Sequence, residues 1–280
     1  MKDKISIIGG DLRIKKLAEM MAKDGINVYT YGLDIQNNVI QCNSIKELVQ
    51  SSDIIIGPVP FCSNGRTINA TFSNEEILLI DFTKELNGKK FIAGAIKENV
   101  YELLKDKNVE IIDILKREEL SVLNSISTAE GAIQIAMENT EITLSGSNIL
   151  ILGFGRIGKV LSKMLDGIGA NVYCEARKPQ DLAWIQAFGY TPIDLKNLNQ
   201  NLDKFDVIMN TIPNVVLDES NLDKVKQDCL IIDLASNPGG VDREEVKRRK
   251  IKFVWALSLP GKVAPVTSAK YIKETIYNIL

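Results

Sequence analysis

Short apolar runs alternate with amphipathic segments along most of the chain, which is the pattern of strand–helix–strand units built around a parallel sheet. In the first half, the short runs predict strands, and segments with apolar residues three or four positions apart predict helices. The predicted strands are Lys4–Ile8, Ile26–Tyr31, Asp53–Ile56, Leu78–Asp81, Phe91–Ala93 and Glu110–Ile112. The predicted helices are Asp11–Lys23, Ile45–Ser51 and Lys97–Lys105.

A long amphipathic segment runs from about Arg117 to Asn139. Its apolar positions fall three or four apart, as one face of a helix requires. They are Leu120, Leu123, Ile126, Ala129, Ile133 and Ala136. Gly131 inside it costs about 1 kcal/mol relative to alanine, which is too little to end the helix. We interpret this segment as a helix that connects two domains.

The second half repeats the same alternation. Predicted strands are Ile149–Leu152, Asn171–Cys174, Val207–Asn210, Leu230–Asp233 and Lys252–Ala256. Predicted helices are Lys159–Ile168, Asp181–Phe188 and Thr267–Ile279. The fold class is therefore α/β, with two Rossmann-like doubly wound domains joined by a connecting helix. We expect a substrate-side catalytic domain over residues 1–125 and a dinucleotide-binding domain over 126–265. Residues 266–280 form a C-terminal helix expected to return to the first domain, near the interdomain cleft.

Composition narrows the function classes. The chain has 280 residues, 45% of them hydrophobic and 25% charged, which is ordinary for a globular protein. The net charge of −2 gives no reason to expect nucleic acid or an anionic membrane as a partner. No apolar run is long enough to cross a bilayer, and the four cysteines form no CxxC pair. A cytoplasmic protein with reduced thiols is expected.

The sequence contains no histidine. This absence excludes Ser-His-Asp triads, Cys-His dyads and every zinc site that uses histidine, and no metal is expected. Proton transfer must use another side chain, a water molecule or the substrate itself.

A glycine-rich stretch, LGFGRIGK at Leu152–Lys159, follows an apolar strand and opens an amphipathic helix. In that context Gly153 permits the tight turn, Gly155 lets the backbone approach a pyrophosphate, and Gly158 allows close packing of helix on strand. The amides of the helix N-terminus favour the phosphates. The stretch predicts a dinucleotide site, and the expected contacts also include Phe154, Arg156 and Ile157.

The end of the next strand carries the features that distinguish NAD from NADP. Glu175 lies 22 positions after Gly153 and suits the ribose 2′-hydroxyl of NAD. Arg177 and Lys178 follow Ala176, and a guanidinium with a neighbouring lysine suits the 2′-phosphate of NADP. We prefer NADP as the cofactor, with NAD as the alternative.

Three loops rich in glycine, proline and small polar residues follow later strands, where ligands of open α/β sheets bind. The loop after Val207–Asn210 and the loop after Leu230–Asp233 are expected to contact the cofactor. Their candidate residues are Thr211, Ile212, Pro213, Ala235 and Ser236. The third loop is a turn at Pro260-Gly261-Lys262.

Seven segments of the chain together form a specific pattern. They are IGGDLR at Ile8–Arg13, STAEGA at Ser127–Ala132, LGFGRIGK at Leu152–Lys159, EARK at Glu175–Lys178, NTIP at Asn210–Pro213, DLASNPGGVD at Asp233–Asp242 and LPGKVAPVTSA at Leu259–Ala269. In this combination, the chain resembles the A subunits of dipicolinate synthase nearly end to end. The resemblance implies a fold similar to D-2-hydroxyacid dehydrogenases, with a catalytic and a cofactor domain.

The resemblance also implies an activity. It is the NADP-dependent oxidation of a dihydrodipicolinate-type intermediate of lysine biosynthesis to pyridine-2,6-dicarboxylate, in the mother cell of a sporulating bacterium. The implied partner is the flavoprotein-like B subunit of dipicolinate synthase, and a homo-oligomer is expected. Two alternatives stay open: another NAD(P)-dependent dehydrogenase of the D-2-hydroxyacid or alanine dehydrogenase type, and a non-catalytic NADP-binding subunit.

A substrate with two carboxylates requires cations, hydroxyls or helix N-termini near the cofactor. Catalytic candidates are Asp11, Arg13, Ser127, Thr128 and Lys262. Substrate-binding candidates are Arg13, Ser127, Ser236, Asn237, Lys262, Thr267 and Ser268, with Arg66 as a weaker one. For Arg13, a carboxylate clamp and a surface helix residue are equally compatible with the sequence. For Ser127 and Thr128, packing in mid-helix is the alternative, and no residue is singled out as the general base.

Overall fold

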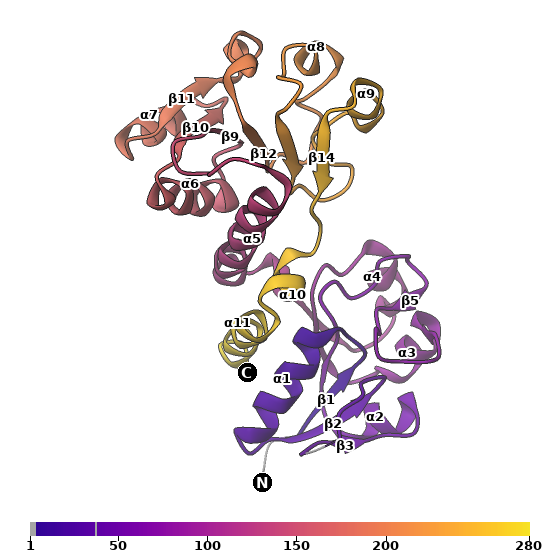
Figure 1. Ribbon diagram of the computed structural model, residues 1–280. Coiled ribbons are helices and arrows are strands. Elements are labelled where there is room, and N and C mark those ends of the chain that lie inside the picture. The colour runs from indigo at the N-terminus through magenta and orange to yellow at the C-terminus, as the bar shows by residue number, and fades with distance from the viewer. Residues whose placement is uncertain (1–3, 37) are drawn as a thin grey trace. The chain divides into compact units, whose positions relative to one another are not determined.

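The computed structural model describes residues 4–36 and 38–280 and divides into two compact units (Figure 1). Unit 1 comprises residues 1–123 and 264–280, and unit 2 comprises residues 124–263. The sequence-based boundaries, after residues 125 and 265, lie two residues beyond these divisions.

Unit 1 is built on a six-stranded sheet with the order β3-β2-β1-β4-β7-β8. Every neighbouring pair in it is parallel. Its strands are β1 (Lys4–Ile8), β2 (Asn27–Tyr31), β3 (Ile40–Gln41), β4 (Ile54–Ile56), β7 (Lys90–Ala93) and β8 (Glu110–Asp113). Its helices are α1 (Leu12–Lys23), α2 (Ile45–Ser51), α3 (Leu79–Glu85), α4 (Glu98–Leu104), η1 (Ile114–Lys116) and α11 (Pro265–Tyr277).

Alternation along β1 separates two apolar clusters. Ile5 and Ile7 contribute to a cluster with α1 and α11, whereas Ile8 contributes to a cluster around three phenylalanine rings. The rings are Phe61, Phe82 and Phe91, with centroids 4.9–5.9 Å apart. Because side chains of a strand point to opposite faces in turn, the sheet is covered on both sides.

The C-terminal helix α11 packs against α1 within unit 1. Its buried residues Ala269, Ile272 and Ile276 join the apolar cluster of α1. Asp24, which ends α1, accepts hydrogen bonds from Lys273 Nζ and Tyr277 Oη, each at 2.7 Å. A chain segment remote in sequence therefore completes this unit.

The strand predicted at Leu78–Asp81 is wrong. Residues Ile77–Leu78 form β6, which pairs antiparallel with β5 (Thr67–Ile68), and Leu79 begins helix α3. Leu79 and Phe82 are both buried three positions apart, which is helical spacing. A short apolar run does not distinguish a strand from a helix by periodicity, and here the next buried position decides for the helix.

Unit 2 repeats the same sheet order, β11-β10-β9-β12-β13-β14, with all pairs parallel. Its strands are β9 (Asn148–Leu152), β10 (Asn171–Ala176), β11 (Thr191–Asp194), β12 (Val207–Asn210), β13 (Leu230–Asp233) and β14 (Lys252–Trp255). Its helices are α6 (Arg156–Ile168), α7 (Pro179–Ala187), η2 (Leu195–Gln200), η3 (Leu202–Lys204), α8 (Glu219–Leu222), α9 (Arg243–Arg249) and α10 (Leu259–Val263). The long helix α5 (Glu118–Asn139) begins just before the unit.

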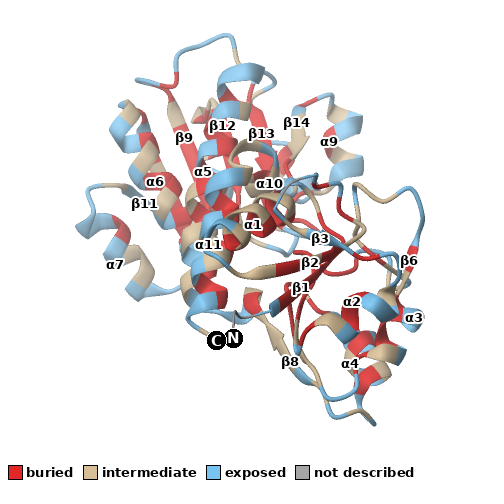
Figure 2. Ribbon diagram, turned by 90° about the horizontal axis from the view of Figure 1, so that it is seen from below, coloured by how far each residue is buried: buried red, intermediate tan, exposed pale blue. Residues whose placement is uncertain are grey.

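Both units are therefore Rossmann-like and doubly wound, as predicted from the sequence. In each sheet the order in which strands are added reverses at the point where the first strand lies beside the fourth. All four residues of β12 and of β13 are buried, and the outward faces of the helices are exposed (Figure 2). The sequence did not predict the short strands β3, β5 and β6, the strand β11, or the helices α8, α9 and α10. Pro260-Gly261-Lys262, expected as a turn, lies in the five-residue helix α10.

Candidate functional site

The turn between β9 and α6 gives each glycine of the predicted fingerprint a distinct steric reason. Gly153 has φ +92°, a backbone conformation that residues other than glycine rarely adopt. A Cβ at Gly158 would lie 2.1 Å from the Gly153 carbonyl oxygen, so only glycine fits there. A Cβ at Gly155 would meet nothing within 4 Å. The turn is therefore tightly built at Gly153 and Gly158 and open at Gly155, as a backbone that admits a phosphate group requires.

The side chains between these glycines serve mainly the core. Phe154 is 6% exposed and joins the apolar cluster under α6, with its ring 6.2 Å from that of Phe188. Ile157 packs against the same cluster. Arg156 is the first residue of α6. The N–H groups in the first turn of an α-helix have no carbonyl acceptor within the helix. Phe154 and Ile157 can thus contribute backbone, rather than side chains, to a phosphate site.

The loop after β12 lies against the glycine-rich turn. Thr211 donates from both its backbone nitrogen and its hydroxyl to the Leu152 carbonyl oxygen, each at 2.9 Å. A Cβ at Gly153 would come within 2.6 Å of Thr211 Oγ1 and 2.9 Å of Ile212 Cγ1. Pro213 follows and is exposed. Two of the three predicted residues of this loop therefore border the turn directly.

Glu175 is 1% exposed and lies beside the turn. In the sheet it stands opposite Leu152 of β9 and Ile193 of β11, and its Oε2 accepts a hydrogen bond of 3.2 Å from the Gly153 N–H. Burial raises the pKa of this carboxyl to about 7, and the Asp194 carboxylate adds to the rise, whereas the Gly153 N–H and Arg177 oppose it. The acid expected at the ribose is therefore within the turn's own hydrogen-bond network.

Arg177 and Lys178 are exposed and follow β10 directly, before α7 begins at Pro179. Ala176 is buried. The two cations thus stand at the carboxyl end of the strand that also carries Glu175. An acid and two bases are together at the position where Rossmann folds distinguish a 2′-hydroxyl from a 2′-phosphate.

A buried polar network joins the ends of β12 and β13, and sequence reasoning missed it. Asp233 Oδ1 accepts from Asn210 Nδ2 at 2.7 Å and from the Ala235 N–H at 3.1 Å, and its Oδ2 accepts from the Gly240 N–H at 2.8 Å. Both side chains are at most 1% exposed. Ala235 is buried, whereas Ser236 and Asn237 beyond it are exposed. The network fixes the loop that carries Ser236 and Asn237. In the sequence, the signal for it was an amide at the end of one predicted strand, Asn210, and an acid at the end of the next, Asp233.

In unit 1, Arg13 is 6% exposed, so its interpretation as a surface helix residue is wrong. Its guanidinium pairs with Asp11, the N-cap of α1, at 2.7 Å and also donates to the Val59 carbonyl oxygen. Asp11 accepts from the Arg13 backbone as well. Both groups therefore have partners that stabilise the start of α1. Arg66 is exposed and lies 3.5 Å from Glu76.

The other candidates are distributed over several elements. On α5, Ser127 is 1% exposed with no hydrogen-bond partner for its hydroxyl, and Thr128 donates to the Asn124 carbonyl oxygen at 2.9 Å, which is ordinary helix packing. Lys262 is exposed on α10. Thr267 is exposed and Ser268 buried in the first turn of α11. Of the catalytic candidates, the structure brings only Asp11 and Arg13 into described contact.

Within residues 4–36 and 38–280, no helix is long and apolar enough to span a membrane. The same residues contain no group of three or more histidine, cysteine, aspartate or glutamate side chains that could hold a metal ion.

Comparison with known proteins identifies both units. Residues 4–115 match the model of the N-terminal domain of the dipicolinate synthase A subunit, and residues 115–246 match the NAD-binding domain of D-isomer specific 2-hydroxyacid dehydrogenases. The A subunit of dipicolinate synthase from Bacillus subtilis (strain 168) is 32% identical over 99% of this chain and 95% of that protein.

Solved structures agree with this result. The crystal structure of the dipicolinate synthase A subunit from Bacillus halodurans has a TM-score of 0.92 at 28% identity, covering 99% of this chain and 97% of the other. The corresponding chain of the Bacillus subtilis enzyme has a TM-score of 0.90 at 30% identity, covering 100% and 96%.

Proposed function

The chain belongs to the family of dipicolinate synthase A subunits, and from that membership we propose that it oxidises a dihydrodipicolinate-type intermediate to pyridine-2,6-dicarboxylate with NADP. The observation that carries the proposal is the turn at Gly153, Gly155 and Gly158, which is open at one glycine and closed at the other two. A plain turn without a ligand would need one glycine for its backbone conformation, but it would not also need the close packing that excludes a side chain at Gly158. The geometry therefore favours a site for a dinucleotide pyrophosphate.

The residues at the carboxyl edge of the unit 2 sheet fit a nicotinamide dinucleotide. The backbone from Gly153 to Gly158 would hold the pyrophosphate, and the end of β10 would hold the adenosine ribose. Thr211, Ile212, Ala235 and Ser236 would border the nicotinamide side. When bound, the cofactor supplies the hydride acceptor.

The absence of histidine agrees with aromatisation of a ring. D-2-hydroxyacid dehydrogenases deprotonate an alcohol with a histidine–carboxylate pair, which this chain cannot form. A dihydropyridine that becomes a pyridine loses one hydride and one proton, and the aromatic product favours both losses. The chain's task is then chiefly to hold a dianionic ring in place and to exclude water. We propose Arg13, Ser127, Ser236, Asn237, Lys262, Thr267 and Ser268 as the residues to examine for that task.

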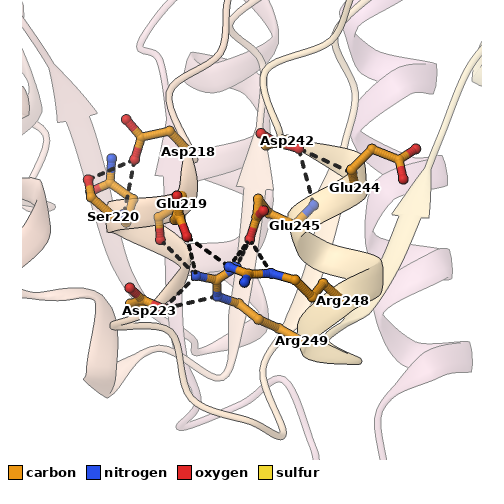
Figure 3. Close-up of polar contacts among 10 residues, drawn as sticks. Asp218, Glu219, Ser220, Asp223, Asp242, Glu244, Glu245, Arg248 and Arg249 are labelled. Carbon is orange, nitrogen blue, oxygen red and sulfur yellow. Dashed lines mark hydrogen bonds and ion pairs between the residues drawn. The ribbon is translucent and has the colours of Figure 1, made fainter.

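We propose NADP, in preference to NAD, as the cofactor because of Arg177 and Lys178. Two other arginines of unit 2, Arg248 and Arg249, are paired with acids and link α8 to α9 through Glu219, Asp223 and Glu245 (Figure 3). Arg177 is exposed directly after the end of β10, where an adenosine 2′-phosphate would lie. We expect Arg177→Ala to weaken NADPH binding about tenfold to a hundredfold and to leave NADH binding nearly unchanged. Arg248→Ala is the matched control, and equal losses for both cofactors with Arg177→Ala would refute the assignment.

The activity has a direct test. The purified chain is incubated with enzymatically generated substrate and NADP, alone and with the second polypeptide of a dipicolinate synthase, and pyridine-2,6-dicarboxylate is measured. Because the relatives are named as A subunits, we propose that the partner is a B subunit. We also propose that the chain forms a homo-oligomer and acts in the cytoplasm of a sporulating mother cell. If neither the chain nor the complex forms product, the activity is refuted. NADPH binding without turnover, even with the partner, would identify a non-catalytic cofactor-binding subunit.

A further inference from the structure

Glu175 lies where both cofactors would present their distinguishing group. The carboxyl is on β10, two residues before Arg177, and is held at the glycine-rich turn by the hydrogen bond from Gly153. A ribose 2′-hydroxyl can donate to an ionised carboxylate at such a position. A 2′-phosphate, which is almost fully doubly charged above pH 7, is repelled by the same carboxylate.

We propose that Glu175 makes the choice between NAD and NADP depend on pH. When ionised, it accepts a hydrogen bond from the 2′-hydroxyl of NAD, and when protonated, it admits the 2′-phosphate of NADP beside Arg177. The proposal rests on the dinucleotide function proposed above and deepens it. It differs from a fixed preference for one cofactor, because a single side chain supports both modes.

The surroundings of the carboxyl support this assignment. Glu175 is 1% exposed, and the Gly153 N–H is its described hydrogen-bond donor. The negative charge of the Asp194 carboxylate on β11 disfavours ionisation of Glu175, and the positive charge of Arg177, which directly follows β10, favours ionisation more weakly. The apolar residues opposite it in the sheet, Leu152 and Ile193, provide no compensating charge. A buried carboxyl with one neutral donor exchanges its proton near neutral pH, in agreement with a pKa of about 7.

The proposal predicts that binding of NADPH is coupled to the uptake of a proton. If NADPH binds the protonated form, its dissociation constant relative to that of NADH rises about fivefold to tenfold between pH 7 and pH 8. The 2′-phosphate contributes little to this change because its own second pKa is about 6. Arginine and lysine side chains do not titrate in this interval.

The experiment measures NADPH and NADH binding to the full chain by nicotinamide fluorescence at pH 7.0, 7.5 and 8.0. Glu175→Gln keeps an oxygen for the Gly153 N–H and cannot ionise, so we expect the ratio of the two dissociation constants to be independent of pH. Asp194→Asn is the matched control, because it removes a neighbouring acid but leaves Glu175 able to ionise, so the ratio should still depend on pH, with its midpoint moved to lower pH. A second measurement needs no variant: at pH 8, calorimetry in buffers of different ionisation enthalpy should show uptake of about one proton with NADPH and none with NADH.

The outcomes separate this inference from the proposed function. If both cofactors bind wild type with a ratio that does not change with pH, or if Glu175→Gln keeps the wild-type dependence, the role of Glu175 is refuted and the dinucleotide site stands. The absence of proton uptake with NADPH at pH 8 refutes it in the same way. If neither cofactor binds at any pH, the proposed function fails, and this inference fails with it.

Discussion

Replacing Gly158 by alanine tests whether the turn at β9 and α6 is built as the geometry indicates. The added Cβ would lie 2.1 Å from the Gly153 carbonyl oxygen and 3.1 Å from its carbon. Both are backbone atoms, so no side chain can rotate away. The start of α6 must then move from β9 by more than about 1 Å to restore an ordinary van der Waals contact of 3.4–4 Å.

The magnitude follows from two opposing effects. Overpacking of this kind costs about 1–3 kcal/mol, and the exclusion here is at the upper end because backbone must move. Alanine also gains about 0.5–1 kcal/mol over glycine inside a helix. The same substitution at Gly167, in the last turn of α6, adds a Cβ that meets nothing within 4 Å and shows the helical gain alone. We therefore expect Gly158→Ala to be less stable than Gly167→Ala by about 2–3 kcal/mol.

Tryptophan fluorescence provides the assay, because the chain's two tryptophans, Trp184 and Trp255, both lie in unit 2. Urea unfolding followed by this signal reports on the unit that contains the turn. NADPH binding is measured in parallel. We expect Gly167→Ala to bind as wild type and Gly158→Ala to bind at least tenfold more weakly, since a shift of about 1 Å misplaces the amides at the helix N-terminus.

Equal stability of the two alanine variants would contradict the close contact between Gly158 and Gly153. Normal cofactor binding by a destabilised Gly158→Ala variant would separate the packing role of this glycine from phosphate recognition. Either result would refute the reasoning that one steric restriction serves both.

Three further expectations follow from the contacts. Gly155→Ala should fold with wild-type stability, because its Cβ is in open space, yet it should weaken NADPH and NADH binding equally in fluorescence titrations; unchanged binding would contradict a phosphate at this glycine. Asp233→Ala leaves three donors without their acceptor and should lower the free energy of unfolding by about 3 kcal/mol in urea; a loss below about 1 kcal/mol would show that the network is not needed. The hydrogen bonds from Lys273 and Tyr277 lower the pKa of Asp24 below its usual value, so the stability it provides is present above the unfolded-state pKa and lost as pH falls through the folded-state pKa. Asp24→Asn should flatten that part of the acid-unfolding curve, and an unchanged curve would refute the linkage.

Much of the fold, and the presence of a nicotinamide-dinucleotide-binding domain, could be predicted because the evidence for them is local. Alternating buried strands and amphipathic helices specify parallel α/β units, and two such sets imply two sheets. The β9–α6 turn is equally local, because the strand, the glycines and the helix start lie within about a dozen residues. Short elements such as β3 and β5, with two residues each, carry too little periodicity to be recognised.

The amino-acid sequence was sufficient to predict the kind of ligand site in unit 2, since glycines placed between a buried strand and a helix leave the backbone few other conformations. The contacts of the charged candidates became known only from the folded chain. Arg13 meets a carbonyl 46 residues away, at Val59, and Glu175 meets the amide of Gly153 beside the neighbouring strand. Such pairings depend on strand order and register, which no local pattern specifies. The physical reason is that burial and hydrogen bonding of a side chain are properties of the packed neighbours, and those neighbours are set only when the sheet has formed.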